Sequence, residues 1–479
     1  MEALLKNTID RFLVNDTIRS ELENLKEQKD DGELHLNLVF KYGLDGSGDQ
    51  ESYNQQDADV DTVLASQMCP LQIVDKETNI VIFQNPLANC PCSHRPVRLS
   101  YEPETREAVE EEYERMKGEI EEMHPYSPQE GIIVHWLGIP TLCDGKTLTY
   151  VTDEAAHSTC PLCGAKEKAI STKGKVFVVK THVKGCPVNV FLFGMAPTHQ
   201  WIRSATLILN LGAYCTIKKP KVQNDNDKAK RATRQNEIAR RIKEELNLTV
   251  FGKGPHGGGV LDGNTSRKLF ENAELFSEIC RVPLDLILAL RKLCRGAASS
   301  KPIDPEKFQL AAEDFERIFF EKYLSRDNQT SWYWLPSSIH KVVKHGSDII
   351  AALPVPPGLA GEEGAEGNNK FFRSIRKDLT CKISAERTLK DLFERLLAKS
   401  DPIMNEYVVK KVFKNRKDEK IPDDLKELLT DEYLQSIEDD EPIDDGNDEA
   451  VEEEEEDMDY SENEGDEEDM EVDSDDELV

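Results

Sequence analysis

Alternating apolar and polar positions predict that the first third of the chain forms a β-sheet. Between Leu34 and Phe40 every second residue is apolar, which is the pattern of a strand with one buried face. Two further β-type runs, at residues 71–74 and 80–83, flank a polar turn and predict a hairpin. The elements that follow are a short β-run at 96–101, a charged helix at roughly 105–123 and an apolar stretch at 131–143.

Helical periodicity dominates the rest of the chain, apart from a β-like run at residues 176–179. It extends from about residue 195 to 350, and residues 1–30 also predict a helix. Two more amphipathic helices are expected at 370–399 and 405–418. The pattern therefore predicts a sheet near the N-terminus, a long helical region and further helices after it.

The negative charge of the chain is concentrated at its C-terminal end. The whole sequence has a net charge of −32, but residues 431–479 hold 28 Asp and Glu and no Lys or Arg, so the other 430 residues carry only −4. A segment so acidic and so poor in apolar residues cannot bury enough surface to fold. We therefore expect a disordered acidic tail on a nearly neutral body.

The composition excludes two classes of protein. No run of eighteen apolar residues occurs, so we expect no transmembrane helix and no membrane partner. The N-terminus lacks the basic start and apolar core of a signal peptide. Eleven cysteines at irregular spacing in a long, unsecreted chain indicate free thiols and metal ligands rather than a disulfide framework.

Two of the expected strands end in Asp-Gly, at Asp45 and Asp144. An aspartate at a strand end can face a cleft while its strand stays fixed, and the following glycine allows a sharp turn beside it. Asp-Gly is also an ordinary turn sequence, and a turn is the simpler interpretation of either site alone. The surrounding elements must therefore decide between the two interpretations.

The order of elements favours a functional interpretation of both aspartates. A strand ending in aspartate, two more strands, a helix and a fourth strand ending in aspartate is the order of an RNase H-like fold. In that fold Asp45 and Asp144 converge, and a later helix would bring Glu366 to the same point. Three carboxylates could then hold two Mg²⁺ ions roughly 3.5–4 Å apart for phosphodiester chemistry.

The motif Cys160-x-x-Cys163 is typical of a zinc site in a chain that is not secreted. The pair needs two more ligands, and the spacing leaves two options open. A solvent-exposed or packed histidine is the simpler interpretation in either option. The local option is His182-x-x-x-Cys186, which would complete a small finger, and the distant option is His340-x-x-x-x-His345.

Lysine and arginine gather in four clusters along the helical region. This density favours contact with phosphate groups, although a solvated helix face is the simpler interpretation of any one cluster. The clusters are Lys218, Lys219 and Lys221; then Lys228, Lys230, Arg231, Arg234, Arg240, Arg241 and Lys243; then Lys370, Arg373, Arg376 and Lys377; and finally Lys410, Lys411, Lys414, Arg416 and Lys417.

Several of these motifs together resemble the catalytic subunit of the V(D)J recombinase and the Transib transposases. Glu366 and the basic run of residues 369–377 (Asn-Lys-Phe-Phe-Arg-Ser-Ile-Arg-Lys) are similar to the final catalytic segment of that family, and the His-x4-His motif lies about twenty residues upstream, as it does there. The other matching segments are Leu44-Asp45-Gly46-Ser47-Gly48-Asp49, Cys160-Pro-Leu-Cys163-Gly-Ala, Pro197-Thr198-His199 and Gly263-Asn264-Thr265-Ser266-Arg267-Lys268-Leu269.

The resemblance covers roughly residues 30–400 and implies a DDE-type DNA transposase or recombinase core without the N-terminal DNA-binding region of that family. It implies that Mg²⁺ or Mn²⁺ is held by Asp45, Asp144 (with Asp153 as the alternative) and Glu366, and that His199 assists near the scissile strand. It favours the distant zinc ligand set, Cys160, Cys163, His340 and His345. The expected DNA contacts are Arg267, Lys268, Lys218, Lys219, Arg240, Arg241 and Arg373.

We therefore expect an α/β fold, an RNase H-like mixed sheet interrupted by a large, mainly helical, zinc-braced insertion. The expected partners are double-stranded DNA, a second copy of the chain and an accessory subunit, in the nucleus. The alternatives are a domesticated or truncated relative that binds DNA or a protein without catalysis, and a zinc-stabilised scaffold.

The expected segments are a helical N-terminus (1–30), the first part of the core (31–157), the insertion (158–350), the rest of the core with C-terminal helices (351–430) and the acidic tail (431–479).

Overall fold

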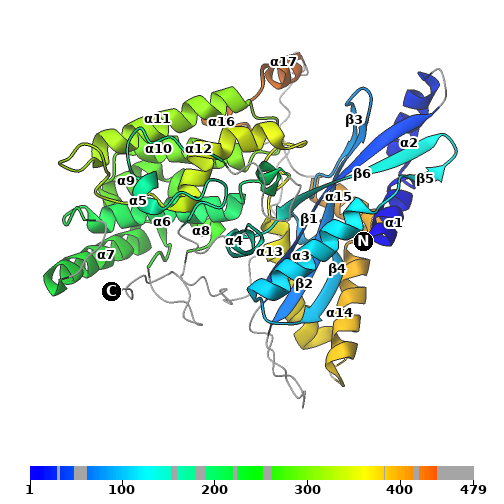
Figure 1. The fold of residues 1–479 in the computed structure, drawn as a ribbon, viewed down its shortest axis with the longest axis horizontal. Helices are drawn as coiled ribbons and strands as arrows, with labels where there is room; N and C mark the ends of the chain where they lie inside the picture. The colour runs from blue at the N-terminus through cyan, green and yellow to red at the C-terminus, as the bar shows by residue number, and fades with distance from the viewer. Residues whose placement is uncertain are drawn as a thin grey trace, which may run out of the picture.

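The chain forms a mixed α/β structure in which a sheet unit and a helical unit lie side by side (Figure 1). None of the helices described is long and apolar enough to cross a membrane. The computed structural model describes residues 1–29, 33–47, 62–152, 159–179, 189–219, 224–251, 261–381, 383–413 and 420–439.

A six-stranded mixed sheet forms the core of the first unit. Its strands run in the order β3-β2-β1-β6-β5, and β4 pairs with the part of β2 that β3 leaves uncovered. Only the pair of β1 and β6 is parallel among the strand pairs described. The strands are β1 (Leu34–Ser47), β2 (Val63–Asp75), β3 (Val81–Gln84), β4 (Arg95–Tyr101), β5 (Tyr126–Gln129) and β6 (Ile132–Leu142).

The parallel pairing of β1 with β6 brings the two Asp-Gly motifs to one edge of the sheet. Gly43 pairs with Leu142, and each aspartate follows its paired residue by two positions. Asp45 is still part of β1, whereas Asp144 has left β6 and caps the next helix, α4 (Gly145–Val151). The expected strand ends are therefore adjacent in space.

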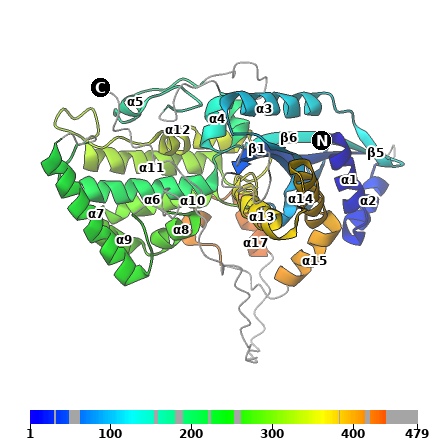
Figure 2. The ribbon, with the colours of Figure 1, turned by 90° about the horizontal axis from the view of Figure 1, so that it is seen from below.

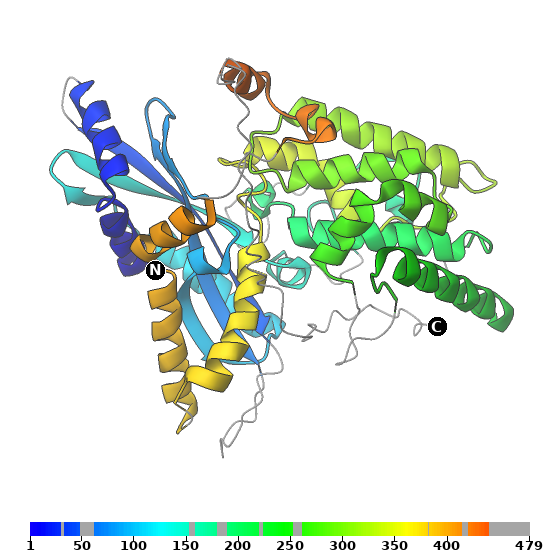
Figure 3. The same cartoon turned by 180° about the vertical axis from the view of Figure 1, so that it is seen from behind.

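Helices cover both faces of the sheet. Helix α3 lies in front of the strands in Figure 1, and α13, α14 and α15 lie in front of them in the opposite view of Figure 3. Helices α4 and α13 lie at the junction with the helical unit (Figure 2). The helices of the sheet unit are α1 (Glu2–Phe12), α2 (Asp16–Glu27), α3 (Arg106–Glu121), α13 (Glu363–Leu379), α14 (Ala385–Lys399) and α15 (Pro402–Phe413), with a short 3₁₀ turn, η1 (Pro91–Ser93).

The helical unit is built around α10, α11 and α12, which bury a row of aromatic rings. Phe308, Phe315 and Phe319 of α11 are fully buried, and their removal from water stabilises this packing. The elements of the unit are α5 (Glu167–Ile170), η2 (Val190–Phe193), α6 (Pro197–Tyr214), α7 (Asp225–Leu246), α8 (Gly263–Glu271), α9 (Ala273–Cys280), α10 (Leu284–Ala297), α11 (Pro305–Tyr323), α12 (Ser337–Ala352) and α16 (Asp423–Lys426).

Three predictions about local structure were wrong. The N-terminal helix is two helices, because the side chain of Asn15 caps α2 and interrupts the first run. Residues 176–179 are not a strand; Val176 and Val178 are 85 % and 82 % exposed, while Phe177 packs on the ring of His340. The segment predicted as one helix at 370–399 is α13 and α14, and α13 begins at Glu363.

The C-terminal boundary also differs from the prediction. Residues 420–430 pack on the helical unit rather than on the sheet, because Leu428 and Leu429 are buried there and Asp424 pairs with both Arg291 and Arg295 of α10. The prediction of a disordered tail from residue 431 was wrong for its first nine residues, which form α17 (Asp431–Asp439). Residues 440–479 lie outside the described part of the chain.

Helix α13 packs closely against η1 through its glycines, and this gives a prediction about stability. A methyl group on Gly364 would meet Cε1 of buried His94 at 2.1 Å, so Gly364→Ala forces one of the two segments to move. We expect a loss of about 1–3 kcal/mol in the free energy of unfolding by urea, as overpacking usually causes. Gly118→Ala in α3 is the matched control, because its methyl group meets nothing within 4 Å.

The control should stabilise the protein by roughly 0.5–1 kcal/mol, since alanine favours a helix more than glycine does. Equal stabilisation by both substitutions would show that α13 does not pack on η1 as described.

Candidate metal centres

The first centre begins with a tight turn that holds the two cysteines of the Cys-x-x-Cys motif. The N–H of Gly164 donates to the carbonyl of Cys160 at 2.8 Å, and the N–H of Cys160 donates to the carbonyl of Ala165 at 2.9 Å. Gly164 has a positive φ of 71°, which a residue with a side chain rarely adopts. The turn therefore presents both thiols from one short loop.

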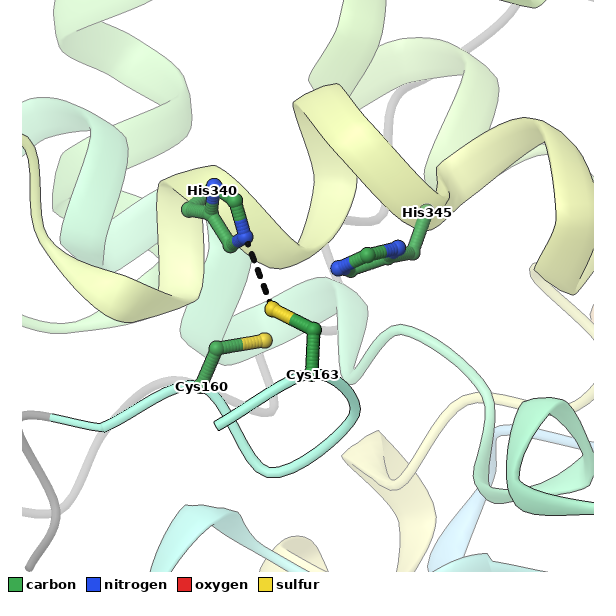
Figure 4. Close-up of side chains that lie close together, drawn as sticks. All are labelled: Cys160, Cys163, His340 and His345. Atoms are coloured by element: carbon green, nitrogen blue, oxygen red, sulfur yellow. Dashed lines mark hydrogen bonds between the residues drawn. The ribbon is translucent and has the colours of Figure 1, made fainter. Parts of the chain in front are cut away.

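Two histidines of α12 face this turn, as Figure 4 shows. Sγ of Cys163 lies 3.3 Å from Nε2 of His340, and the rings of His340 and His345 are 5.2 Å apart at 84°. One ligand atom from each of Cys160, Cys163, His340 and His345 lies within 4.8 Å of all the others. The four side chains thus converge although about 180 residues separate the cysteines from the histidines.

The chemistry of this cluster fits a tetrahedral metal ion. Two thiolates and two imidazoles on one ion lie roughly 3.5–3.8 Å from one another, close to the contact seen here. Nε2 of His345 is buried and has no hydrogen-bond partner among the described residues, so it has a lone pair available for a metal. The thiol of Cys163 and the two neighbouring imidazoles hold the pKa of Cys160 far below its ordinary value.

The distant ligand set is the one that the structure brings together. His340 and His345 are each only 2 % exposed, which separates them from ordinary surface histidines. The local alternative, His182 and Cys186, lies outside the described residues. The predicted grouping of Cys160 and Cys163 with the two histidines of α12 is therefore confirmed as a group that could hold a metal.

The second centre joins the start of α6 to the start of α13. Nδ1 of His199 lies 3.2 Å from Oε1 of Glu362 and 3.1 Å from Oε1 of Glu366. The two glutamates are four residues apart, so one turn of helix places them on the same face. Ligand atoms of His199, Glu362 and Glu366 all lie within 4.8 Å of one another, which makes the cluster a second group able to hold a metal.

Burial and the neighbouring charges have opposite effects on the pKa values of Glu362 and His199 in this second cluster. Burial acts to raise the pKa of Glu362, but its hydrogen bond and ion pair with His199 outweigh this effect and hold the pKa below its ordinary value. Burial acts to lower the pKa of His199, but Glu362 and Glu366 raise it to about 10. At neutral pH an imidazolium therefore balances part of the carboxylate charge.

Both predicted aspartates lie near this cluster without belonging to it. Nδ2 of Asn369, three residues after Glu366 on α13, donates to Oδ2 of Asp45 at 2.8 Å. Asp144 accepts from the N–H of Thr147 at 2.6 Å, and its charge contributes to the raised pKa of His199. Among the described residues, neither aspartate joins Glu366 in a group with all ligand atoms within 4.8 Å. The alternative residue, Asp153, lies outside the described part.

A buried lysine fixes the approach of α13 to the sheet. Nζ of Lys41 on β1 donates to Oδ1 of Asn89 at 2.9 Å, to the carbonyl of Leu359 at 3.0 Å and to that of Gly361 at 2.5 Å. Burial lowers the pKa of Lys41. Because Gly361 directly precedes Glu362, these bonds tie the start of the glutamate-bearing segment to the strand that carries Asp45.

Sequence reasoning missed Glu362, Asn369 and Lys41 as members of this site. A signal for Glu362 was present, because a second glutamate four residues before Glu366 shares its helical face. Asn369 was quoted only as part of a basic run. Lys41 gave no signal, since a lysine in an alternating strand is normally assigned to the solvent face.

The predicted DNA-binding residues fall into two groups. Arg267 of α8 pairs with Glu363 at the start of α13, and Arg373 lies on α13 itself, so these two lie near the second centre. Lys219 and Arg241 pair with acidic residues at 3.3 and 2.7 Å, and Arg240 pairs with Glu244. Figures 1 and 2 place α7 at the end of the helical unit away from the sheet. Lys218 and Lys268 are exposed.

The second centre predicts that a substitution of Glu362 weakens metal binding. Its Oε2 atom is buried and has no hydrogen-bond partner among the described residues, which leaves it available to a cation. We expect Glu362→Gln to weaken Mn²⁺ binding by at least about 10-fold in calorimetric titration, since one ligand charge is lost. Asp378→Asn is the control, because it makes the same chemical change at an exposed position near the other end of α13. Equal affinities of the two variants would contradict this assignment.

Comparison with known proteins found no relative of this chain. No family model matches the chain, and no curated protein matches it. The geometry of the two centres therefore carries the functional argument.

Proposed function

We propose that the protein is a metal-dependent DNA-processing enzyme, the core of a DDE-type transposase or recombinase that cleaves DNA and transfers strands at DNA ends. The observation that carries the proposal is that α13 brings Glu366 beside His199 and holds Asp45 through Asn369. Two-metal phosphoryl transfer needs carboxylates held close together, and α13 carries Glu366 toward the ends of the two parallel strands. The resemblance to the V(D)J recombinase and Transib families gives the same assignment of residues.

An RNase H-like core is part of this proposal. The run β3-β2-β1-β6, with β2 antiparallel and β6 parallel to β1, supports it. The edge strand β5 is a departure from the expected element order, because it forms an antiparallel hairpin with β6. The helical unit interrupts the core between α4 and α13.

The proposed reaction assigns a role to each acidic side chain. Mg²⁺ or Mn²⁺, when bound, would activate a water or a 3′-hydroxyl and stabilise the leaving oxygen. Asp45, Asp144 and Glu366 would hold the metal ions, with Glu362 as a further ligand. His199, which lies beside Glu362 and Glu366, would donate a hydrogen bond to a phosphate oxygen of the scissile strand.

Zinc is the proposed occupant of the Cys/His centre. Two cysteines and two histidines at these distances form a common structural zinc set, with no position left open for a substrate. Such an ion would fasten the loop after α4 to α12, and so hold the helical unit next to the sheet unit. Double-stranded DNA, a second copy of the chain, an accessory subunit and a nuclear location belong to the same proposal.

Cleavage of DNA by the purified full chain tests the proposal. Duplexes that carry candidate terminal repeats would be incubated with Mg²⁺, Mn²⁺ or a chelator, and nicks and hairpins read on denaturing gels. We expect products only with a divalent metal. DNA binding without any cleavage in either metal would favour the binding-only relative, and neither binding nor cleavage would favour a structural role.

A further inference from the structure

A pair of thiols lies in and next to η1, the turn that packs against α13, and belongs to neither metal centre. Cys90 caps the 3₁₀ turn η1, and Cys92 is the second residue of that turn. Sγ of Cys92 donates to Sγ of Cys90 at 2.7 Å, and the N–H of Cys92 also points to Sγ of Cys90 at 3.4 Å. Two donors therefore converge on one sulfur atom.

A buried ammonium group adds to this pair. Nζ of Lys399, at the end of α14, is buried and has no hydrogen-bond partner among the described residues; it lies 3.1 Å from the centre of the Phe371 ring. Hydrogen bonds from Cys92 and the charge of Lys399 lower the pKa of Cys90 to about 6, although burial opposes this. Burial lowers the pKa of Lys399 to about 8.

Apart from Cys160 and Cys163 of the first metal centre, the other thiols described lack this combination of neighbours. Cys69 is fully buried, and burial raises its pKa to about 12. Cys215 and Cys381 are half-buried like Cys90, but neither has a second sulfur in hydrogen-bond contact. A thiolate is the reactive form of cysteine, and partial exposure is needed for a reagent to reach it.

We propose that Cys90 and Cys92 form a reactive dithiol that is oxidised by peroxides. The Cys90 thiolate attacks one oxygen of the peroxide; an S–O bond forms, the O–O bond breaks, and the released hydroxide takes up a proton to give water. The sulfur of Cys92 then attacks the sulfur of Cys90; the S–S bond forms, the S–O bond breaks, and the departing hydroxide takes up the thiol proton of Cys92 to leave as water. The thiol pair loses two electrons and the peroxide gains them.

Oxidation at this position would reach α13 through direct contacts. A methyl group on Gly367 would meet Cγ of Pro91 at 2.5 Å, and Nδ1–H of His94 donates a hydrogen bond to the carbonyl of Cys90 at 3.0 Å. A disulfide needs its sulfur atoms about 2.05 Å apart. Closing the pair therefore shifts the backbone of η1, against which the glycines flanking Glu366 are packed.

Thiol chemistry on the intact full-length protein tests this proposal without reference to DNA. At pH 7 and limiting iodoacetamide, we expect Cys90 to be alkylated at least 10-fold faster than Cys215 or Cys381 in the same chain. After treatment with hydrogen peroxide, the peptide of residues 77–98, which contains only these two cysteines, should lose about two mass units for the two hydrogen atoms removed. Similar alkylation rates together with an unchanged peptide mass would overturn the proposal.

Two variants separate the roles within the pair. In Cys92→Ser we expect oxidation to stop at a sulfenic acid on Cys90, which dimedone labels. In Lys399→Met we expect alkylation of Cys90 to slow several-fold, while Lys390→Met, at an exposed position on the same helix, leaves the rate unchanged. Circular dichroism confirms that each variant is folded. A disulfide that still forms in Cys92→Ser would assign the second thiol elsewhere and overturn the pairing.

Discussion

Replacing Glu366 by glutamine is expected to reduce metal-dependent DNA cleavage at least about 1,000-fold, the scale of losses seen when a group acting in the transition state is removed. Glutamine keeps the shape of the side chain but loses the negative charge that a divalent ion needs. The position is also coupled to His199, which lies 3.1 Å from the Glu366 carboxylate. The measurement is the single-turnover rate of nicking with Mg²⁺ and Mn²⁺ under saturating protein.

The control for this experiment lies on the same helix. Asp378→Asn changes the same functional group at an exposed position two to three turns after Asn369, and we expect it to cleave at the wild-type rate. DNA binding at low salt should survive in both variants, because phosphate contacts come from basic residues. If Glu366→Gln cleaves like wild type, the assignment of α13 to the active centre fails.

Replacing Cys163 by serine is expected to lower the free energy of unfolding of the helical unit by at least about 3 kcal/mol. A bound structural zinc contributes its binding energy to folding, roughly 10–16 kcal/mol in zinc-finger peptides, so loss of one thiolate removes a substantial part of it. His340 and His345 would then be buried next to an incomplete ligand set. The expected readouts are an earlier thermal transition and less than one zinc per chain by atomic absorption.

Cys215→Ser serves as the control for this second prediction. Cys215 follows α6, is half-buried and does not belong to the cluster, so its loss should cost less than about 1 kcal/mol and leave the zinc content unchanged. A chelator added to the wild type should reproduce the effect of Cys163→Ser. Stability and metal content that are identical in both variants would show that the four side chains pack together without a metal.

The sequence predicted the sheet well because its strands follow simple rules. Residues 34–38 alternate in burial as predicted, although β1 is buried on both faces from Leu38 to Leu44; the apolar stretch that forms β6 has no competing period. Strand β5, with the sequence Tyr-Ser-Pro-Gln, was missed, because it is short, polar and contains a proline. Its pairing with β6 depends on the neighbouring strand rather than on its own residues.

The ligand sets of the metal centres could be predicted from the sequence only in part. Spacing alone left the partners of Cys160 and Cys163 undecided, because ligands about 180 residues away follow from the packing of α12 and not from any local pattern. Asp45 and Asp144 could be placed together from the order of elements. The cluster of His199 with Glu362 required the position of α6 relative to α13, which no periodicity specifies.

The C-terminal segment was misplaced for a related reason. Residues 420–430 were expected with the core, yet Asp424 and Glu427 pair with arginine and lysine of α10, and the two leucines that follow Glu427 are buried. The acidic composition of a segment is an average over many residues. A few apolar residues at the right spacing within that segment are enough to pack a short helix against the helical unit. The same averaging hid α17 at the start of the acidic region.

The buried lysine of β1 has a consequence for the synthesis of the chain on the ribosome. Its backbone acceptors, Leu359 and Gly361, lie 318 and 320 residues later in the sequence, so at roughly 5–20 residues per second they follow Lys41 by about 15–60 s. Until then the lysine has only part of its final set of acceptors, and that face of the nascent sheet must stay hydrated. The helical unit is translated within this interval. The contact between β1 and the segment before α13 therefore forms only after the helical unit has been made.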